Sequence, residues 1–392
     1  MRKTREELNE IKKKYGVDTL WSWSRLSSYN QSPFEYYLKY IVYPRVKEDR
    51  ADSIYTYAGS LAHTIMEDLH EGKIKHEDMT ERFDDDWFTL TLSNYKFDRN
   101  DEIKNQNIQE KYLLNLQHFF KHHKLMGDNV AIEKYIIIKI GNHIFNGYID
   151  AVHKDEDGNY IVTDFKTSTI YTGKKIDKEQ NQLVLYSEGL RQMGIPPNKI
   201  KARWNFLKYC TVETQLANGK TNERNIERCK IGESLASNAR MWLKKLGHED
   251  EVDGYIDLLQ QTNSVECLPE DVQKKYKFDD CYVYVLLNED VINALKVDIL
   301  DTIHEIQTKE IEYQKTQDDK LFWDDMENVA KDSFYFSTLC SYSGKLHKPY
   351  GEYLEQLESK KNNKDNLFDG VGSKNKNENE IAEDDLSWLE MI

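Results

Sequence analysis

The chain has 392 residues, of which 39% are hydrophobic, and its formal net charge at pH 7 is −15. This length fits one elaborated domain or a core with a second helical lobe. The charge excludes a uniformly basic protein that coats DNA. A local basic groove and bound divalent cations would still allow such a chain to bind phosphates.

The chain has the features of a protein from a reducing compartment. Its five cysteines, at 210, 229, 267, 281 and 340, form no CxxC pair, which is typical of free thiols. No uncharged stretch approaches the roughly 18 residues that cross a bilayer, and the start has no apolar run of signal-peptide length. We expect a cytoplasmic protein with no membrane partner. The high use of Asn, Lys, Tyr and Ile suits a bacterium or phage of low GC content, so the compartment would be the host cytoplasm if the gene is viral.

Helices are predicted for most of the first 127 residues. Residues 1–50 have helical spacing, with Ser32-Pro33 placing a proline at a helix start. Residues 53–72 form another helix, in which His63 and Glu67 lie one turn apart beside an apolar face. A further amphipathic helix is expected over 100–127.

The spacing of apolar residues then changes to that of strands. Three alternating segments, at 132–140, 143–152 and 159–167, are separated by turn signals at 141–142 and 155–159. They predict a meander of three antiparallel strands. A helix over 177–193, ended by Gly194, and a strand over 200–209 come next. The predicted order is helix, three strands, helix, strand.

The rest of the chain is mostly helical by pattern. Residues 225–358 contain one strand-like run at 281–287 and a long helix from about 289 to 316. Residues 359–382 have the composition of a linker, and an acidic and apolar tip at 382–392 ends the chain. Gly219-Lys220-Thr221 resembles the end of a phosphate-binding loop. No glycine stands five residues earlier and no apolar strand precedes it, so no nucleotide site is predicted.

Two carboxylates and a lysine meet in the predicted meander. Asp150 and Asp164 lie on adjacent strands, and Lys166 projects from the same face as Asp164. Carboxylates bind Mg²⁺ or Mn²⁺, which activates a water, and a lysine neutralises charge on a phosphate. The alternative interpretation is that Asp150, Asp164 and Lys166 are ordinary charged residues at strand ends, exposed to solvent. Because Asp164 and Lys166 interrupt an apolar strand, where two like charges need a cation, we favour a site for phosphodiester hydrolysis.

Five motifs occur in the order known from one nuclease family. They are residues 24–34, residues 59–63 with Glu67, residues 147–150, residues 164–167 and residues 182–186. Over about 22–210 the chain resembles the RecB-type nuclease family of the PD-(D/E)xK superfamily, which includes CRISPR-associated RecB-like exonucleases and the nuclease domains of recombination helicase-nucleases. The resemblance implies an α/β restriction-endonuclease-like core, a central mixed sheet flanked by helices, with large helical additions. We expect a nuclease core with amino-terminal helices over 1–210, a mostly helical region over 211–358 and a flexible linker with the acidic tip over 359–392.

The resemblance also implies roles for individual residues. The metal, Mg²⁺ or Mn²⁺, would be bound by His63, Asp150, Asp164 and the main-chain carbonyl of Phe165. Lys166 would be catalytic together with the two aspartates. Gln182 and Tyr186 would position Lys166 or the DNA end, although their separation of one helical turn is also ordinary core spacing.

One feature of the family is incomplete here. Many relatives hold an iron–sulfur cluster with four cysteines, whereas this chain has Ser32 at the first position and only Cys340 in the late segment. A serine hydroxyl does not replace a thiolate ligand. We expect no iron–sulfur cluster, and ordinary packing of the late segment on the amino-terminal helices.

These observations predict a metal-dependent DNA nuclease, an exonuclease rather than an endonuclease, acting in recombination, replication or repair. The alternatives are a catalytically weak DNA-binding or scaffold protein on a nuclease fold, and a structure-specific endonuclease with the same site. The tip at 382–392 is a candidate site for a replication or recombination protein. Candidate phosphate contacts beside the site are Lys174, Lys175, Lys201, Arg203 and Lys208.

Overall fold

The computed structural model describes residues 2–42, 53–93, 95–98, 100–126, 130–340 and 348–368. The chain divides into two compact units, each assembled from separate stretches. The terminal unit comprises Met1–Ser53, Lys139–Asn146 and Lys296–Ile392. The second, which we call the central unit, comprises Ile54–Ile138 and Gly147–Leu295. The acidic tip at 382–392 lies outside the described residues.

The described residues contain a mixed sheet of seven strands. The strands are β1 Leu20–Trp21, β2 Ala131–Ile140, β3 His143–Lys154, β4 Tyr160–Lys166, β5 Ile200–Gln215, β6 Thr221–Glu227 and β7 Tyr276–Val285. Their order is β1-β3-β4-β5-β6, with β2 paired to β3 and β7 paired to β5. β4 is antiparallel to β3 and parallel to β5, while β5 is antiparallel to β6 and β7. The predicted α/β fold with a central mixed sheet is confirmed.

The parallel pairing of β4 and β5 requires a crossover, which two helices supply. These are α7 Lys174–Glu179 and α8 Asn181–Gln192. α8 packs closely against β2, because a Cβ atom added to Gly189 would lie 2.4 Å from Cδ1 of Ile136. A larger residue at this position would displace the side chains of Ile136 and Ile138.

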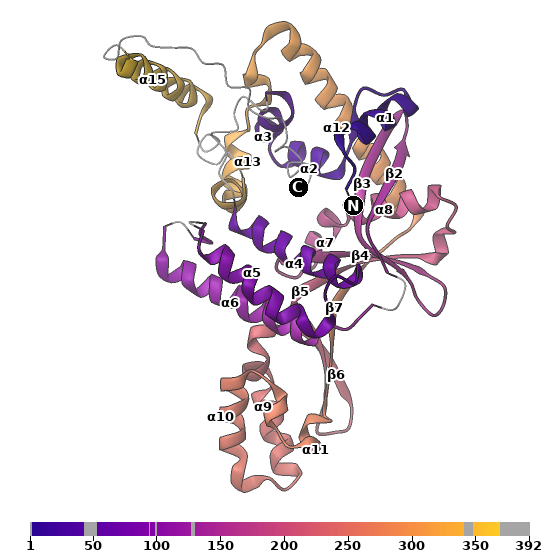
Figure 1. Cartoon of the computed structure of the whole chain (residues 1–392), viewed down its shortest axis with the longest axis vertical. Coiled ribbons are helices and arrows are strands. Elements are labelled where there is room, and N and C mark those ends of the chain that lie inside the picture. Colours follow the sequence, from indigo (N-terminus) through magenta and orange to yellow (C-terminus); the bar gives the residue numbers. More distant parts are fainter. Residues whose placement is uncertain are drawn as a thin grey trace. The chain divides into compact units, whose positions relative to one another are not determined.

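Three helices of the central unit build its apolar core. They are α4 Ile54–His70, α5 Met79–Thr91 and α6 Glu102–His122 (Figure 1). Their buried side chains, among them Ile65, Phe83 and Phe119, form one cluster with Phe165 of β4 and Leu207 of β5. Full burial of each such side chain stabilises the fold by roughly 1.5–3 kcal/mol. The cluster therefore fixes α4 against the strand that carries the predicted catalytic lysine.

A protruding segment, residues 209–280, which we call the arm, extends the central unit (Figure 1). The carboxyl-terminal part of β5 pairs there with β6 and with the start of β7, beyond the end of β4. The arm also contains α9 Ile231–Lys245, α10 Val252–Thr262 and α11 Glu270–Gln273. It has its own apolar core around Leu235 and Leu259. A Cβ at Gly232 would lie 2.2 Å from the carbonyl oxygen of Leu259, so this glycine lets α9 and α10 meet.

The terminal unit joins the start of the chain to its late helices. Its helices are α1 Arg5–Tyr15, α2 Trp23–Gln31, α3 Pro33–Tyr36, most of α12 Glu289–Thr316, α13 Met326–Lys331 and α15 Tyr350–Phe368. The Tyr36 hydroxyl donates to Glu310 at 2.7 Å, and the Ser32 hydroxyl donates to Asp324 at 2.7 Å. Cys340 is buried, and residues 341–347 lie outside the described residues. The amino-terminal helices therefore contact α12 and the residues that follow it, through one part-buried and one buried hydrogen bond. The expected packing of the late segment around Cys340 stays a prediction. Absence of an iron–sulfur cluster stays a prediction.

Short helical turns complete the described chain. The 3₁₀ turns are His76–Asp78, Pro197–Lys199, Arg228–Lys230, Glu249–Glu251, Val265–Cys267 and Asp319–Phe322, and the π turns are Tyr37–Ile41 and Tyr335–Leu339. No helix among the residues that the structure describes is long and apolar enough to cross a membrane.

The elements differ from the predicted ones in three regions. Near the amino terminus, β1 interrupts the helix expected over 1–50, and α5 was not predicted. The other differences lie around the arm and at the end of α15. β5 continues to Gln215, β7 begins at Tyr276, and β6 was not predicted. The β6 sequence TNERNIE is exposed along most of its length, so it lacks the alternation that marks a half-buried strand. Helix α15 continues to Phe368, into the segment predicted as a linker from residue 359.

Candidate functional site

The two predicted metal-binding aspartates lie at the same end of the central unit's sheet. The last paired residues of β3 and β4 are Ala151 and Thr163, and each aspartate comes one position beyond them. The main-chain N–H of Phe165 donates to Oδ2 of Asp150 at 2.8 Å, which ties the two strand ends together. Asp164 is only 4% exposed. The carboxylates are therefore placed by the strand pairing and not by a flexible loop.

Helix α4 brings His63 to this strand end. Nδ1 of His63 lies 3.5 Å from Oδ2 of Asp150, and Nε2 lies 3.0 Å from the carbonyl oxygen of Phe165. The imidazole also stands edge-on to the Phe165 ring, with 5.8 Å between ring centroids. On the same helix, a Cβ at Gly59 would be 3.6 Å from Oγ1 of Thr167. The motif on α4 thus contacts the strand motif along two turns of helix.

The predicted catalytic lysine is paired with the buried aspartate. Nζ of Lys166 lies 2.8 Å from Oδ2 of Asp164. Burial raises the pKa of Asp164, and Asp150 raises it further, while Lys166 opposes both. Burial lowers the pKa of Lys166, but Asp164, Tyr171 and Asp150 more than offset this and the net direction is upward. Lys166 is therefore held in its charged form by the negative groups around it.

Tyr186 of α8 lies near the site residues, and Gln182 of the same helix contacts it. The Gln182 amide donates to the Tyr186 hydroxyl at 3.2 Å. A Cβ added to Gly147 would lie 2.8 Å from Cε1 of Tyr186 and 3.0 Å from its hydroxyl oxygen, so the ring crosses β3 where only glycine leaves room. Burial raises the pKa of Tyr186; the negative charges of Asp150 and Asp164 act in the same direction. The tyrosine hydroxyl thus remains protonated beside the two carboxylates.

One neighbour of the lysine was missed by sequence reasoning. Tyr171 is buried, and its ring stands edge-on to Trp204 and Phe206 of β5, with centroid distances of 5.1 and 5.0 Å. Its hydroxyl contributes to the raised pKa of Lys166. A single tyrosine after a run of Ser and Thr gives no periodic signal, so the sequence could not single it out.

Three of the five basic residues proposed as phosphate contacts are engaged elsewhere. Arg203 is 7% exposed and donates to a threonine of β4 and a tyrosine of β7 at 3.0 Å each. Lys208 is 8% exposed, and its Nζ lies 4.1 Å from the centre of the Tyr112 ring. Lys201 pairs with Asp155 at 3.3 Å. Lys174 and Lys175 are exposed. Arg203, Lys208 and Lys201 are thus explained by packing and ion pairing, which the sequence alone did not reveal.

The donor atoms fit a hard divalent cation. They are the imidazole of His63, the carboxylates of Asp150 and Asp164, and the carbonyl oxygen of Phe165. Oδ2 of Asp164 is buried and accepts no well-formed hydrogen bond, with the Lys166 ammonium as its ion-pair partner. A buried carboxylate of this kind is costly unless a cation compensates it. Oxygen ligands with one imidazole suit Mg²⁺ or Mn²⁺. In the described part of the chain, no three His, Cys, Asp or Glu side chains already stand as a closed metal-binding group.

Comparison with protein families identifies the superfamily of this chain. The sequence model of the PD-(D/E)XK nuclease superfamily matches residues 20–318 of this chain. None of the curated proteins matches it. The matched range contains all seven of the site residues named from the sequence, from His63 to Tyr186.

Proposed function

The chain belongs to the PD-(D/E)XK nuclease superfamily, and we propose that it is a metal-dependent deoxyribonuclease of the RecB type. The observation that carries this proposal is the convergence at one strand end of His63, Asp150, Asp164, Lys166 and the Phe165 carbonyl. Its preference for DNA and for chain ends rests on the order of motifs shared with RecB-type exonucleases. We propose that it acts in recombination, replication or repair, in the cytoplasm or in the host cytoplasm if it is encoded by a phage.

Each of these groups has a chemical task in the proposed reaction. A cation held by His63, Asp150, Asp164 and the Phe165 carbonyl would supply a bound water of lowered pKa and offset the charge that builds on the phosphate. Lys166 is charged, so it donates to a phosphate oxygen or orients the attacking water. Asp164 fixes the ammonium through the 2.8 Å contact. Tyr186 and Gln182 form the wall that positions Lys166 or the DNA end.

Digestion of linear and covalently closed circular DNA with Mg²⁺ or Mn²⁺ tests the proposal. We expect the purified protein to degrade linear DNA and to leave closed circles intact. Lys166→Ala and Asp164→Asn should abolish cleavage while DNA binding survives, because charge stabilisation and the cation are lost but phosphate contacts elsewhere remain. Lys199→Ala is the matched control, since Lys199 precedes β5 at the opposite end of the strand.

The outcomes separate the alternatives. Unchanged cleavage by both site variants would contradict the site assignment. Cutting of closed circles would make the protein an endonuclease that uses the same site. Tight DNA binding with no cleavage in either metal would favour the scaffold hypothesis.

We also propose a role for the acidic and apolar tip at 382–392. It contains Leu386, Trp388, Leu389 and Ile392 among four acidic residues. An apolar cluster of this size exceeds what solubility requires and is typical of interaction sites. A replication or recombination protein with an apolar pocket rimmed by Lys or Arg would fit it, and binding would bring the nuclease to DNA-processing machinery.

A further inference from the structure

The end of the arm carries a cluster of lysines on an otherwise acidic protein. Lys220 follows the turn between β5 and β6, Lys245 is the last residue of α9, and Lys275 precedes β7. Lys220 and Lys245 are exposed and Lys275 is partly exposed. No carboxylate pairs with these three lysines in the part of the chain that the structure describes. We call them the arm lysines.

Two of the three lysines lie over one tryptophan, and a main-chain hydrogen bond holds the third at the adjoining turn. Nζ of Lys275 lies 4.5 Å and Nζ of Lys245 lies 5.4 Å from the ring of Trp242. The Trp242 indole N–H donates to the Gln215 carbonyl at 2.8 Å, and the Gln215 N–H donates to the Lys275 carbonyl at 2.9 Å. The main-chain N–H of Leu216, the residue after Gln215, donates to the Lys220 carbonyl. The Lys245 ammonium also donates to the Ala217 carbonyl at 3.0 Å. Lys245 and Lys275 are therefore held beside the tryptophan, and the main chain of Lys220 is fixed at the adjoining turn.

The strand pairing sets the distance between the site and the arm lysines. Lys166 at the end of β4 is level with Phe206 of β5, which runs parallel to it and continues into the arm. This distance is better measured along β7 than along β5, because the pairing of β5 with β7 shifts between Asn205 and Cys210. Tyr282 of β7 is paired with Asn205, at the level of the site, and Lys275 comes seven residues earlier in the chain. At roughly 3.3 Å per residue, the separation is about 23 Å.

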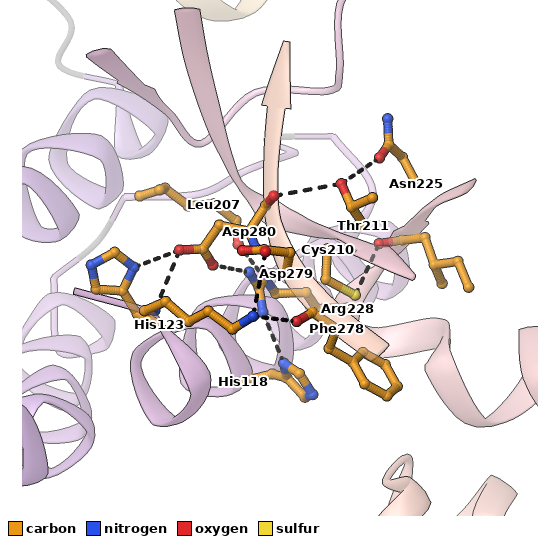
Figure 2. A network of polar contacts seen from close by, with 12 residues as sticks. His118, His123, Leu207, Cys210, Thr211, Asn225, Arg228, Phe278, Asp279 and Asp280 are labelled. Carbon is orange, nitrogen blue, oxygen red and sulfur yellow. Dashed lines mark hydrogen bonds and ion pairs between the residues drawn. The ribbon is translucent and has the colours of Figure 1, made fainter. Parts of the chain in front are cut away.

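A buried ion-pair network fixes the base of the arm (Figure 2). Arg228 donates to Asp280 at 2.7 Å and to the carbonyl oxygen of Leu207 at 3.0 Å. Nδ1 of His123, which follows α6, lies 2.7 Å from the other Asp280 oxygen. Arg228 and Asp280 are 2% and 3% exposed. Because β5, β7 and the end of α6 meet in this network, the arm lysines are held at a set distance from the strand end.

We infer that the arm lysines bind the phosphate backbone of duplex DNA six or seven base pairs away from the phosphate being cut. About 23 Å corresponds to that many base pairs at roughly 3.4 Å each. The inference rests on the proposed nuclease function, because DNA is the ligand. Lysines recognise phosphates as point charges without reading sequence, so the contact would tether DNA of any sequence.

Hairpin DNAs of two stem lengths test the distance. A stem of five base pairs ends before the arm lysines, whereas a stem of twenty base pairs passes them. The arm variant is Lys220→Gln, Lys245→Gln and Lys275→Gln combined. The control variant is Lys154→Gln, Lys199→Gln and Lys201→Gln, which removes the same charge at the far end of β3 and β5. Affinity is measured by fluorescence anisotropy and cleavage by kcat/KM, over a range of salt concentrations.

We expect the arm variant to lose about tenfold or more in affinity for the long stem, with a salt slope reduced by about 3, one for each lost phosphate contact. Its kcat/KM on the short stem should equal that of the unchanged protein, and the control variant should match the unchanged protein on both stems. An unaltered melting temperature would show that the arm is still folded.

Two results would overturn the inference. Equal losses on both stems would mean that the lysines serve the fold or the site itself. If the arm variant loses no affinity for either stem, the arm lysines do not bind DNA, and an acidic protein surface would be the alternative ligand. If the unchanged protein cuts no DNA at all, the proposed function fails, and the anisotropy difference between long and short stems still decides whether the arm binds DNA.

Discussion

Replacing Arg228 with methionine is the sharpest test of how the arm is anchored. The side chains of Arg228 and its partner Asp280 are 2% and 1% exposed. Methionine keeps much of the volume of the arginine stem but supplies no donor. The substitution leaves the Asp280 carboxylate buried, with the hydrogen bond from His123 but without its nearest cation. It also leaves the Leu207 carbonyl without the Nε donor.

The expected cost follows from these contacts. Removing one partner of a buried ion pair costs about 3–5 kcal/mol of unfolding free energy, because the other charge stays uncompensated. We expect the lower end, about 3 kcal/mol, since His123 and the Lys124 N–H still bind Asp280. Adding Asp280→Asn to Arg228→Met removes the uncompensated charge. The double variant should therefore be more stable than the sum of the single losses predicts, by at least about 1 kcal/mol.

Urea denaturation at pH 7, extrapolated to water, measures these differences. The pH dependence gives a second check. Burial opposes ionisation of Asp280, but His123 and Arg228 more than offset it and lower its pKa. The stabilisation is therefore present above the unfolded pKa near 4 and is lost as the pH falls through the lower folded pKa. A loss below about 1 kcal/mol for Arg228→Met, or strict additivity in the double variant, would refute the reasoning.

Four further predictions concern other parts of the chain. Gly147→Ala should lower the melting temperature and the cleavage rate, at a cost of about 1–3 kcal/mol, because the new methyl group overlaps the Tyr186 ring; restoration of stability by Tyr186→Leu would check the cause. Burial raises the pKa of Asp324 to about 6, so its proton stabilises the folded state at low pH. This stabilisation, about 3 kcal/mol at most, is lost as the pH rises from about 4 to 6. The unfolding free energy of Asp324→Asn should lack this pH dependence, and a pH profile identical to that of the unchanged protein would contradict the prediction. EDTA should stop cleavage and Mn²⁺ should restore it, whereas full activity in chelator would exclude the metal mechanism. Deletion of 382–392 should leave cleavage of naked DNA unchanged and reduce co-purification with a replication or recombination protein; a lower melting temperature would instead place the tip in the fold.

The sequence by itself determined the features that depend on local pattern. The pattern of apolar residues predicted β2, β3 and β4 closely, because successive side chains of a strand point to opposite faces; β4 is buried on both of its faces. The same spacing places Asp164 and Lys166 on one face of β4. The turn between β3 and β4 is short, so pairing the two strands antiparallel sets Asp150 beside Asp164. These relations need no information from distant parts of the chain.

Tertiary structure alone decided the features that join residues far apart in sequence. Arg228 and Asp280 are separated by 52 positions, and nothing around either residue indicates that both are buried. Arg203 looked like a phosphate contact because an isolated arginine on a strand resembles a surface charge, yet β4 and β7 enclose it. β6 has one apolar residue, Ile226, among six polar ones, and its pairing with β5 identifies it as a strand. In each case the energy comes from a partner that the local sequence does not contain, and so only the fold could assign it.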